Sequence, residues 1–163
     1  MEGTMLSLRP LTVQDLSAVA RLEQAAYPGA LLEGEREFAE KLEAYPSGAL
    51  GLFDGNALAA YLFCHPWTLN EVYALGSGRP RIPATPDCLY IHDLVVGAQY
   101  RGSGAASRLV EQAYAIARAE HLPACALVAV LGSETFWKRQ GFEEKRRLDY
   151  KGGITGRYMI KCL

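Results

Sequence analysis

The sequence predicts an α/β (α+β) domain in which helices flank a β-sheet that contains a parallel strand pair. Residues 124–131 are wholly apolar, as in a strand buried on both faces, and residues 89–96 form a second strand-like segment. Between these two segments lie a glycine-rich turn and an amphipathic helix at residues 104–120, so the three together form a parallel β-α-β unit. The dipeptide Asp54-Gly55 separates two further strand-like segments and favours a hairpin turn.

The first half of the chain is predicted to contain a strand, two helices and this hairpin. Thr12 and Asp15 form a capping-box pattern, which indicates the start of a helix that Pro28 ends. Apolar residues recur at helical spacing in a second segment, which Pro46 ends. The expected elements are a strand from Leu8, a helix between Thr12 and Pro28, a helix at 35–44, and hairpin strands at 49–53 and 57–64.

The second half begins with a long loop and ends with two strands. Residues 66–87 hold four of the eight prolines and show no sustained period, so we expect a long loop that is either a functional lid or disordered. Ser133 can cap a short helix that ends near Gln140. Closing strands are expected at residues 144–150 and 157–162, and no second domain boundary or repeat is visible, so residues 1–163 are predicted to be one domain.

Charge and composition exclude several classes of function. The 163 residues carry 17 basic and 18 acidic side chains, so the chain lacks the basic surface that binds nucleic acid. No apolar run is long enough to cross a membrane. The four cysteines form no C-x-x-C pair, and no secretory apolar segment is present, so we expect a cytoplasmic protein without a metal site.

The turn before the helix at 104–120 is suited to bind a phosphate. The first N–H groups of a helix have no backbone acceptor, and the missing side chains of Gly102 and Gly104 let an anion approach them. Two familiar phosphate motifs fit poorly. A Walker loop is absent, and the dinucleotide fingerprint fails at Ser107 and at the end of the next strand, where Val130 and Leu131 replace an acidic residue.

The same turn resembles the R/Q-x-x-G-x-G/A signature of the GNAT superfamily of acyl-CoA-dependent N-acyltransferases. Gln99, Gly102 and Gly104 match it in one frame, and Arg101, Gly104 and Ala106 match it in a second frame. The order of the expected elements resembles the superfamily fold over nearly the whole chain. The resemblance implies a mixed, mostly antiparallel sheet with a central parallel strand pair that splays apart.

The resemblance also implies the residues that hold acetyl-CoA. The main chain of Leu94, Val95 and Val96 would pair with the pantetheine arm, and Phe136 and Trp137 would lie beside the thioester. The pyrophosphate would be held at the turn, by Gln99, Arg101, Gly102, Ser103, Gly104, Ala105 and Ala106.

His92 is the expected general base for an amine acceptor. A primary alkylamine is only about one part in a thousand free base at pH 7, so a group must remove its proton, and an imidazole can do so near neutrality. Strand alternation places Tyr90, His92, Leu94 and Val96 on one face, with Asp93 on the other unless a bulge intervenes. A hydrogen-bonded, partly buried histidine is the alternative interpretation of His92.

The pair Tyr90 and His92 resembles the arylalkylamine N-acetyltransferase branch, where two histidines relay protons. Tyr90 would therefore be a second catalytic residue. Trp137 departs from the family, in which a tyrosine at this place protonates the leaving thiolate, since indole N–H is a donor but not a useful acid. Solvent or Tyr150 is expected to supply that proton.

These observations predict a transferase that moves an acetyl group from acetyl-CoA to a small-molecule or peptide amine. The alternative is a non-catalytic acyl-CoA sensor. The acceptor pocket is expected between residues 27–33 and the loop at 66–87, with Tyr27, Trp67 and Tyr73 as its aromatic side chains. Glu33 or Glu71 would attract the cationic amine. The acceptor could be an aromatic amine, a polyamine, an amino acid or a protein N-terminus, and the protein a monomer or a homodimer.

Overall fold

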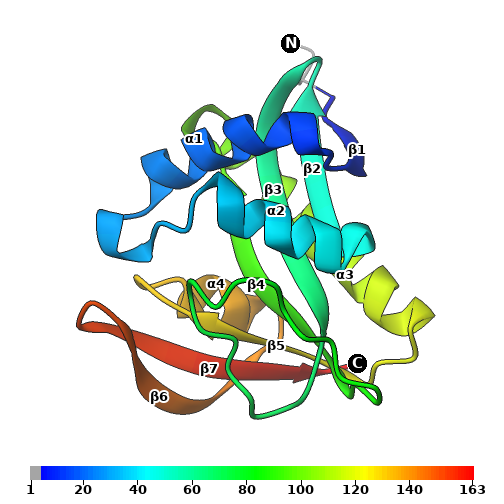
Figure 1. Ribbon diagram of the computed structural model, residues 1–163, viewed down its shortest axis with the longest axis vertical. Coiled ribbons are helices and arrows are strands. Elements are labelled where there is room, and N and C mark those ends of the chain that lie inside the picture. The colour runs from blue at the N-terminus through cyan, green and yellow to red at the C-terminus, as the bar shows by residue number, and fades with distance from the viewer. Residues whose placement is uncertain (1–4) are drawn as a thin grey trace.

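The computed structural model describes residues 5–163, which form a seven-stranded mixed sheet with α-helices on both faces (Figure 1). The strands lie in the order β1-β2-β3-β4-β5-β7-β6, and the β4–β5 pair is parallel while the others are antiparallel. The strands are β1 (Ser7–Pro10), β2 (Ala49–Asp54), β3 (Ala57–Trp67), β4 (Cys88–Val96), β5 (Ala124–Ala129), β6 (Glu143–Lys151) and β7 (Ile154–Cys162).

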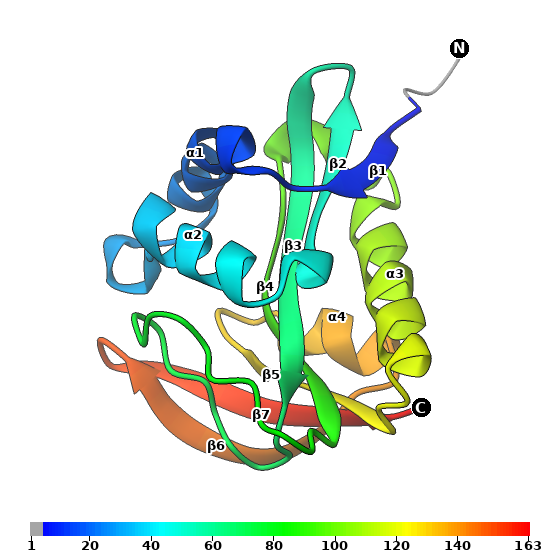
Figure 2. The ribbon, with the colours of Figure 1, turned by 45° about the vertical axis from the view of Figure 1, so that its right-hand side comes forward.

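The helices divide between the two faces of the sheet. Figure 2 shows α1 (Leu16–Ala26) and α2 (Glu35–Ala44) on one face, with α3 (Ala105–Ala119) and α4 (Glu134–Arg139) on the other. Each face has its own apolar cluster, one centred on Phe38 and one on Leu109, because both sides of the central strands carry buried side chains. No helix within residues 5–163 combines the length and apolar composition needed to cross a bilayer.

The α+β fold predicted from the sequence is confirmed, and the differences lie at the ends of elements. The helix expected at 104–120 spans Ala105–Ala119, and the Asp54-Gly55 turn joins β2 to β3. β3 continues to Trp67, beyond the expected end at Cys64. His65 is therefore a strand residue that pairs with Tyr90 and is 3% exposed. Because apolar alternation stops at His65 and Pro66, the sequence pattern ended this strand too early.

The central parallel strands are in contact along only a short stretch. β4 and β5 pair at Leu89 with Cys125 and at Tyr90 with Ala126, and at no further residue of either strand. Beyond Tyr90 the two strands diverge, which confirms the splayed pair that the family resemblance implied. Main-chain groups of β4 from residue 92 onward therefore lack a neighbouring strand on this side.

Gly48 is a position where the packing before β2 requires glycine. A Cβ at Gly48 would lie 1.9 Å from the carbonyl oxygen of Cys64, whereas a Cβ at Gly29 would have no atom within 4 Å. Gly48→Ala is expected to lower the free energy of unfolding by about 1–3 kcal/mol, because β3 must shift to admit the methyl group. Urea denaturation measures this effect. Gly29→Ala is the control, and equal losses in the two variants would contradict the packing argument.

Candidate active site

A one-residue bulge in β4 sets the direction of its side chains. Cys64 pairs with Ile91 and the preceding residue Phe63 pairs with Asp93, so His92 is the extra residue in β4. Leu94 packs on the same apolar cluster as Ile91, on the α3 side of the sheet. The prediction that His92, Leu94 and Val96 share a face is therefore wrong. The bulge turns His92 and Asp93 together toward the opposite side.

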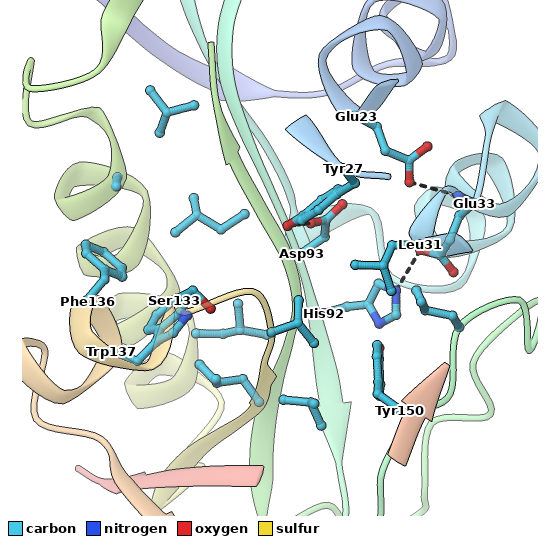
Figure 3. A pocket seen from close by; sticks show the side chains of 18 residues that line it. Glu23, Tyr27, Leu31, Glu33, His92, Asp93, Ser133, Phe136, Trp137 and Tyr150 are labelled. Atoms are coloured by element: carbon cyan, nitrogen blue, oxygen red, sulfur yellow. Dashed lines mark hydrogen bonds and ion pairs between the residues drawn. The ribbon is translucent and has the colours of Figure 1, made fainter. Parts of the chain in front are cut away.

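A cavity of about 210 Å³ passes through the sheet where β4 and β5 diverge. Phe136 and Trp137 line it on the α3 side, and Tyr27, Glu33 and Tyr150 line it on the α1 and α2 side (Figure 3). His92 and Asp93 line the cavity between these two groups. The cavity thus joins the two sides of the molecule that the sequence predicted for coenzyme and acceptor.

Glu33 and His92 form a buried pair at the centre of the cavity wall. Glu33 lies in the connection between α1 and α2, and its Oε1 is 2.7 Å from His92 Nε2. The two side chains are 2% and 1% exposed, respectively. Lys41 Nζ lies 3.0 Å from each Glu33 oxygen and is also buried. Glu33 therefore has its own partners within the protein, whereas the sequence suggested that Glu33 or Glu71 would attract the substrate amine.

The charges around Glu33 keep its carboxylate ionised. Burial alone would raise the pKa of Glu33, but the charge and hydrogen bond of His92, the charge of Lys41 and the Gly76 amide together lower it to about 2. At neutral pH this carboxylate is therefore a hydrogen-bond acceptor only.

A second buried acid, Asp93, is held by two phenols. Tyr27 Oη donates to Asp93 Oδ1 at 2.9 Å, and Tyr61 Oη donates to Asp93 Oδ2 at 2.7 Å. Burial raises the pKa of Asp93, while the charge of His92 and these two hydrogen bonds act to lower it. The sequence suggested that Asp93 would orient His92 if the strand were bulged. The strand is bulged, but the side chain of Asp93 bonds to the tyrosines instead.

The glycine turn presents free N–H groups next to this cavity. Gly102 and Gly104 both have positive φ, and a Cβ at either would meet no atom within 4 Å. Within residues 5–163 the N–H groups of Gly102, Gly104 and Ala106 have no acceptor, and Ala106 lines the cavity. Gln99, Arg101 and Ser103 are exposed around the turn. These N–H groups are placed to bind the phosphate of a ligand whose remaining part enters the cavity.

The main chain of β4 offers further groups that can bind the part of this ligand inside the cavity. The side chain of His92 is 1% exposed, yet the residue as a whole is partly exposed, so its accessible atoms belong to the main chain. Leu94 and Val96 also line the cavity and are partly exposed, whereas Val95 points to the other face and is buried. Such unpaired strand groups can bind a ligand that carries amides.

Several predicted site residues lie elsewhere. Tyr90 is 1% exposed and belongs to a cluster with Tyr73 and Tyr158 outside the cavity, although its ring is 6.3 Å from that of His92. Tyr73 packs against His92 at 5.1 Å and Trp67 stacks on His65, so neither lines the acceptor side. Leu75 is the residue of the long loop that does.

Two charged residues of the site were not predicted from the sequence. Glu23 lines the cavity and accepts hydrogen bonds from the main-chain N–H groups of Glu33 and Gly34, which fixes the connection that carries Glu33. Lys41 lies one turn after Phe38 on the apolar face of α2. A lysine at that position of a buried face was the available signal for a buried ion pair.

Comparisons with known proteins agree with this architecture. A model of the acetyltransferase (GNAT) family matches residues 16–142. A search of the curated proteins found no match. Among solved structures, Ard1 from Thermoplasma volcanium has a TM-score of 0.80 at 13% identity and covers 97% of each chain. The loading GNATL domain of CurA from Lyngbya majuscula has a TM-score of 0.82 at 12% identity and covers 97% of this chain and 98% of its own.

A third structure was solved with a ligand in place. It is Naa50 from Arabidopsis thaliana in complex with the bisubstrate analogue CoA-Ac-MVNAL, with a TM-score of 0.73 at 18% identity and coverage of 97% of this chain and 99% of its own. At these identities the three structures establish a shared fold.

The hydrogen bond from Tyr61 to Asp93 makes a measurable prediction. Tyr61→Phe should lower the free energy of unfolding by about 1.5–3 kcal/mol, because the Asp93 carboxylate loses one of its two phenol donors. Urea denaturation measures the change. Tyr100→Phe is the control, since Tyr100 donates to the partly exposed Asp54 at 2.9 Å. The free energy of unfolding should fall much less in this variant. Equal losses of unfolding free energy in the two variants would show that the surroundings of Asp93 do not strengthen its hydrogen bond with Tyr61.

Proposed function

Because the chain belongs to the acetyltransferase (GNAT) family, we propose that residues 1–163 form one domain that transfers an acetyl group from acetyl-CoA to a primary amine. The observation that carries this proposal is the cavity through the sheet. It begins beside the free N–H groups of the glycine turn and ends beside the buried imidazole of His92. The coenzyme and the amine would therefore approach each other from opposite faces.

The residues of the turn and of β4 suit acetyl-CoA as the cosubstrate, which when bound supplies the acetyl group as an activated thioester. The free N–H groups of Gly102, Gly104 and Ala106 and the guanidinium of Arg101 would bind its phosphates. Main-chain groups of Leu94, Val95 and Val96 would hold its amide-bearing arm. Phe136 and Trp137 form the apolar wall on that side of the cavity and exclude water from it.

His92 would accept the proton of the substrate ammonium. It is the histidine that lines the cavity, and it lies at the bulge where the two halves of the cavity meet. A neutral imidazole can accept a proton on its unprotonated ring nitrogen. Tyr90 would contribute through packing behind His92, because its hydroxyl does not line the cavity.

Tyr150 is the proton donor that the cavity offers on the acceptor side. Tyr27 also lines this side, but its hydroxyl is bonded to Asp93. Burial and the nearby carboxylates of Glu33 and Asp93 raise the pKa of Tyr150, so its phenol stays protonated at neutral pH. Trp137 can donate a hydrogen bond from its indole but cannot release a proton.

The acceptor side favours a small amine. The turn between β6 and β7 packs against the segment at Ala30, where a Cβ at Gly152 would lie 2.9 Å from the Ala30 methyl. Leu31, Leu75 and the rings of Tyr27 and Tyr150 form the walls beneath this contact. An apolar or aromatic amine fits such walls, and its ammonium can interact with the faces of the tyrosines. Naa50 binds a peptide-derived analogue, so a free peptide N-terminus belongs in the test as well.

A binding measurement followed by turnover tests the function. Acetyl-CoA, CoA and NADH are titrated in a thermal-shift assay, and thiol release is then followed over an aromatic amine, a polyamine and a peptide with a free N-terminus. We expect acetyl-CoA to raise the melting temperature and at least one amine to release thiol. Stabilisation without turnover by any amine would favour an acyl-CoA sensor, and no response to acetyl-CoA would overturn the proposal.

His92→Ala tests the base. It should lower kcat/KM by about 10²-fold or more and flatten the acidic limb of the pH profile, because that limb reports protonation of the catalytic base. The measurement is kcat/KM between pH 5 and pH 9, with acetyl-CoA binding by calorimetry as the control for folding. A pH profile equal to that of the wild type would exclude His92 from proton transfer.

A further inference from the structure

We propose that Glu33 is a positioning residue that accepts a hydrogen bond from His92 Nε2–H and so leaves Nδ1 as the atom that takes the substrate proton. This inference rests on the proposed function, in which His92 is the base. It identifies which nitrogen acts and which side chain, far from His92 in the sequence, orients the ring.

The Glu33 carboxylate is held in place by contacts with several parts of the chain. One oxygen lies 2.7 Å from His92 Nε2, and both oxygens lie 3.0 Å from Lys41 Nζ. The main-chain N–H of Gly76, in the long loop, donates to Oε2 at 3.2 Å. The main-chain N–H of Glu33 is in turn bound to Glu23, which holds this segment in place. Contacts from α1, α2, β4 and the long loop thus fix the position of the Glu33 carboxylate next to the imidazole.

The chemistry of the pair determines where the hydrogen lies. An ionised carboxylate accepts hydrogen bonds but cannot donate them, so the 2.7 Å contact requires a hydrogen on His92 Nε2. The neutral ring then carries its lone pair on Nδ1. This atom is buried and has no protein partner, unlike almost every other buried polar side-chain atom in residues 5–163.

The proton transfer that follows is balanced. An N–H bond of the substrate ammonium breaks and its electron pair stays on the amine nitrogen, while a new N–H bond forms at Nδ1. The ring becomes an imidazolium that keeps its Nε2–H bond to Glu33. The carboxylate thus stabilises the charge that appears on His92, and no other reactant is consumed.

Lys41 opposes the stabilisation of the imidazolium by Glu33, so its replacement provides a second test. It neutralises much of the charge of Glu33, which limits how strongly the carboxylate favours the protonated ring. The other titratable groups packed around His92 are Tyr73 from the loop, His65 from β3, Tyr90 and Asp93 from β4, and Tyr150 from β6. Asp93 is bound by two phenols and the pKa of His65 is lowered by burial to about 3, and both groups stay the same when Glu33 or Lys41 is replaced.

Nitrogen NMR on protein labelled at its three histidines tests the tautomer without any activity measurement. In its neutral form, His92 should show hydrogen on Nε2 and a lone pair on Nδ1. His92→Ala identifies its signals. A hydrogen on Nδ1 together with a lone pair on Nε2 in the wild type would overturn the inference, whatever the activity of the protein.

The pH profile of kcat/KM tests the role of the charge. Glu33→Gln should lower kcat/KM by about 10- to 100-fold and move the midpoint of the acidic limb to lower pH, because the protonated ring loses its anion. Lys41→Met should move that midpoint to higher pH, because the uncompensated carboxylate favours the protonated ring. Opposite shifts distinguish positioning from a general loss of structure. Shifts of the same sign, or none, would overturn the inference.

Glu37→Gln is the matched control. Glu37 also binds the long loop, through the N–H of Gly78 at 3.0 Å, but it does not contact His92. The Glu37→Gln variant should leave the midpoint of the acidic limb unchanged. If Glu33→Gln fails to fold because Lys41 stays buried without a partner, the double variant Glu33→Gln with Lys41→Met removes both charges. That variant should still fold and show the lower midpoint and reduced kcat/KM.

The two proposals fail differently. If His92→Ala keeps the wild-type pH profile, the proposed base is wrong. If His92→Ala flattens the acidic limb but Glu33→Gln and Lys41→Met leave its midpoint unchanged, the base stands and only the role of Glu33 is wrong.

Discussion

A single extra residue in β4 determines which side chains meet at the centre of the sheet. Without the bulge at His92, strand alternation would point Asp93 away from His92 and would bring Leu94 to the acceptor side. With it, His92 and Asp93 face the cavity from the α1 and α2 side while Leu94 packs toward α3. The same stretch of β4 has lost β5 as a neighbour, so main-chain groups and a titratable side chain become available at one place.

Placing charges at this depth is costly, and the structure compensates each of them. Glu33 is bound by His92, Lys41 and the amide of Gly76, and Asp93 is bound by two tyrosine hydroxyls. A buried ion pair seldom adds net stability, but removing one partner leaves a charge without compensation. The network therefore holds the orientation of a few side chains more than it stabilises the fold.

Local patterns predicted most of the fold but only part of the site. The helix at Ala105–Ala119, the Asp54-Gly55 hairpin and the glycine turn all follow from periodicity or turn chemistry over a few residues. The bulge at His92 depends on how β4 pairs with β3, and the contact of His92 with Glu33 joins residues 59 positions apart. Neither can be read from spacing, so Glu33 was expected to bind substrate and Tyr90 to share the site.

The three segments over the proposed acceptor end of the cavity come from distant parts of the chain: the turn at Ala30, the loop at Leu75 and Gly76, and the hairpin tip at Gly152. None of them belongs to β4, β5 or the turn that leads into α3. Under the proposed function, exchange or lengthening of these surface segments would alter the choice of amine while the coenzyme half of the cavity keeps its shape, so that one scaffold would diversify toward new acceptors.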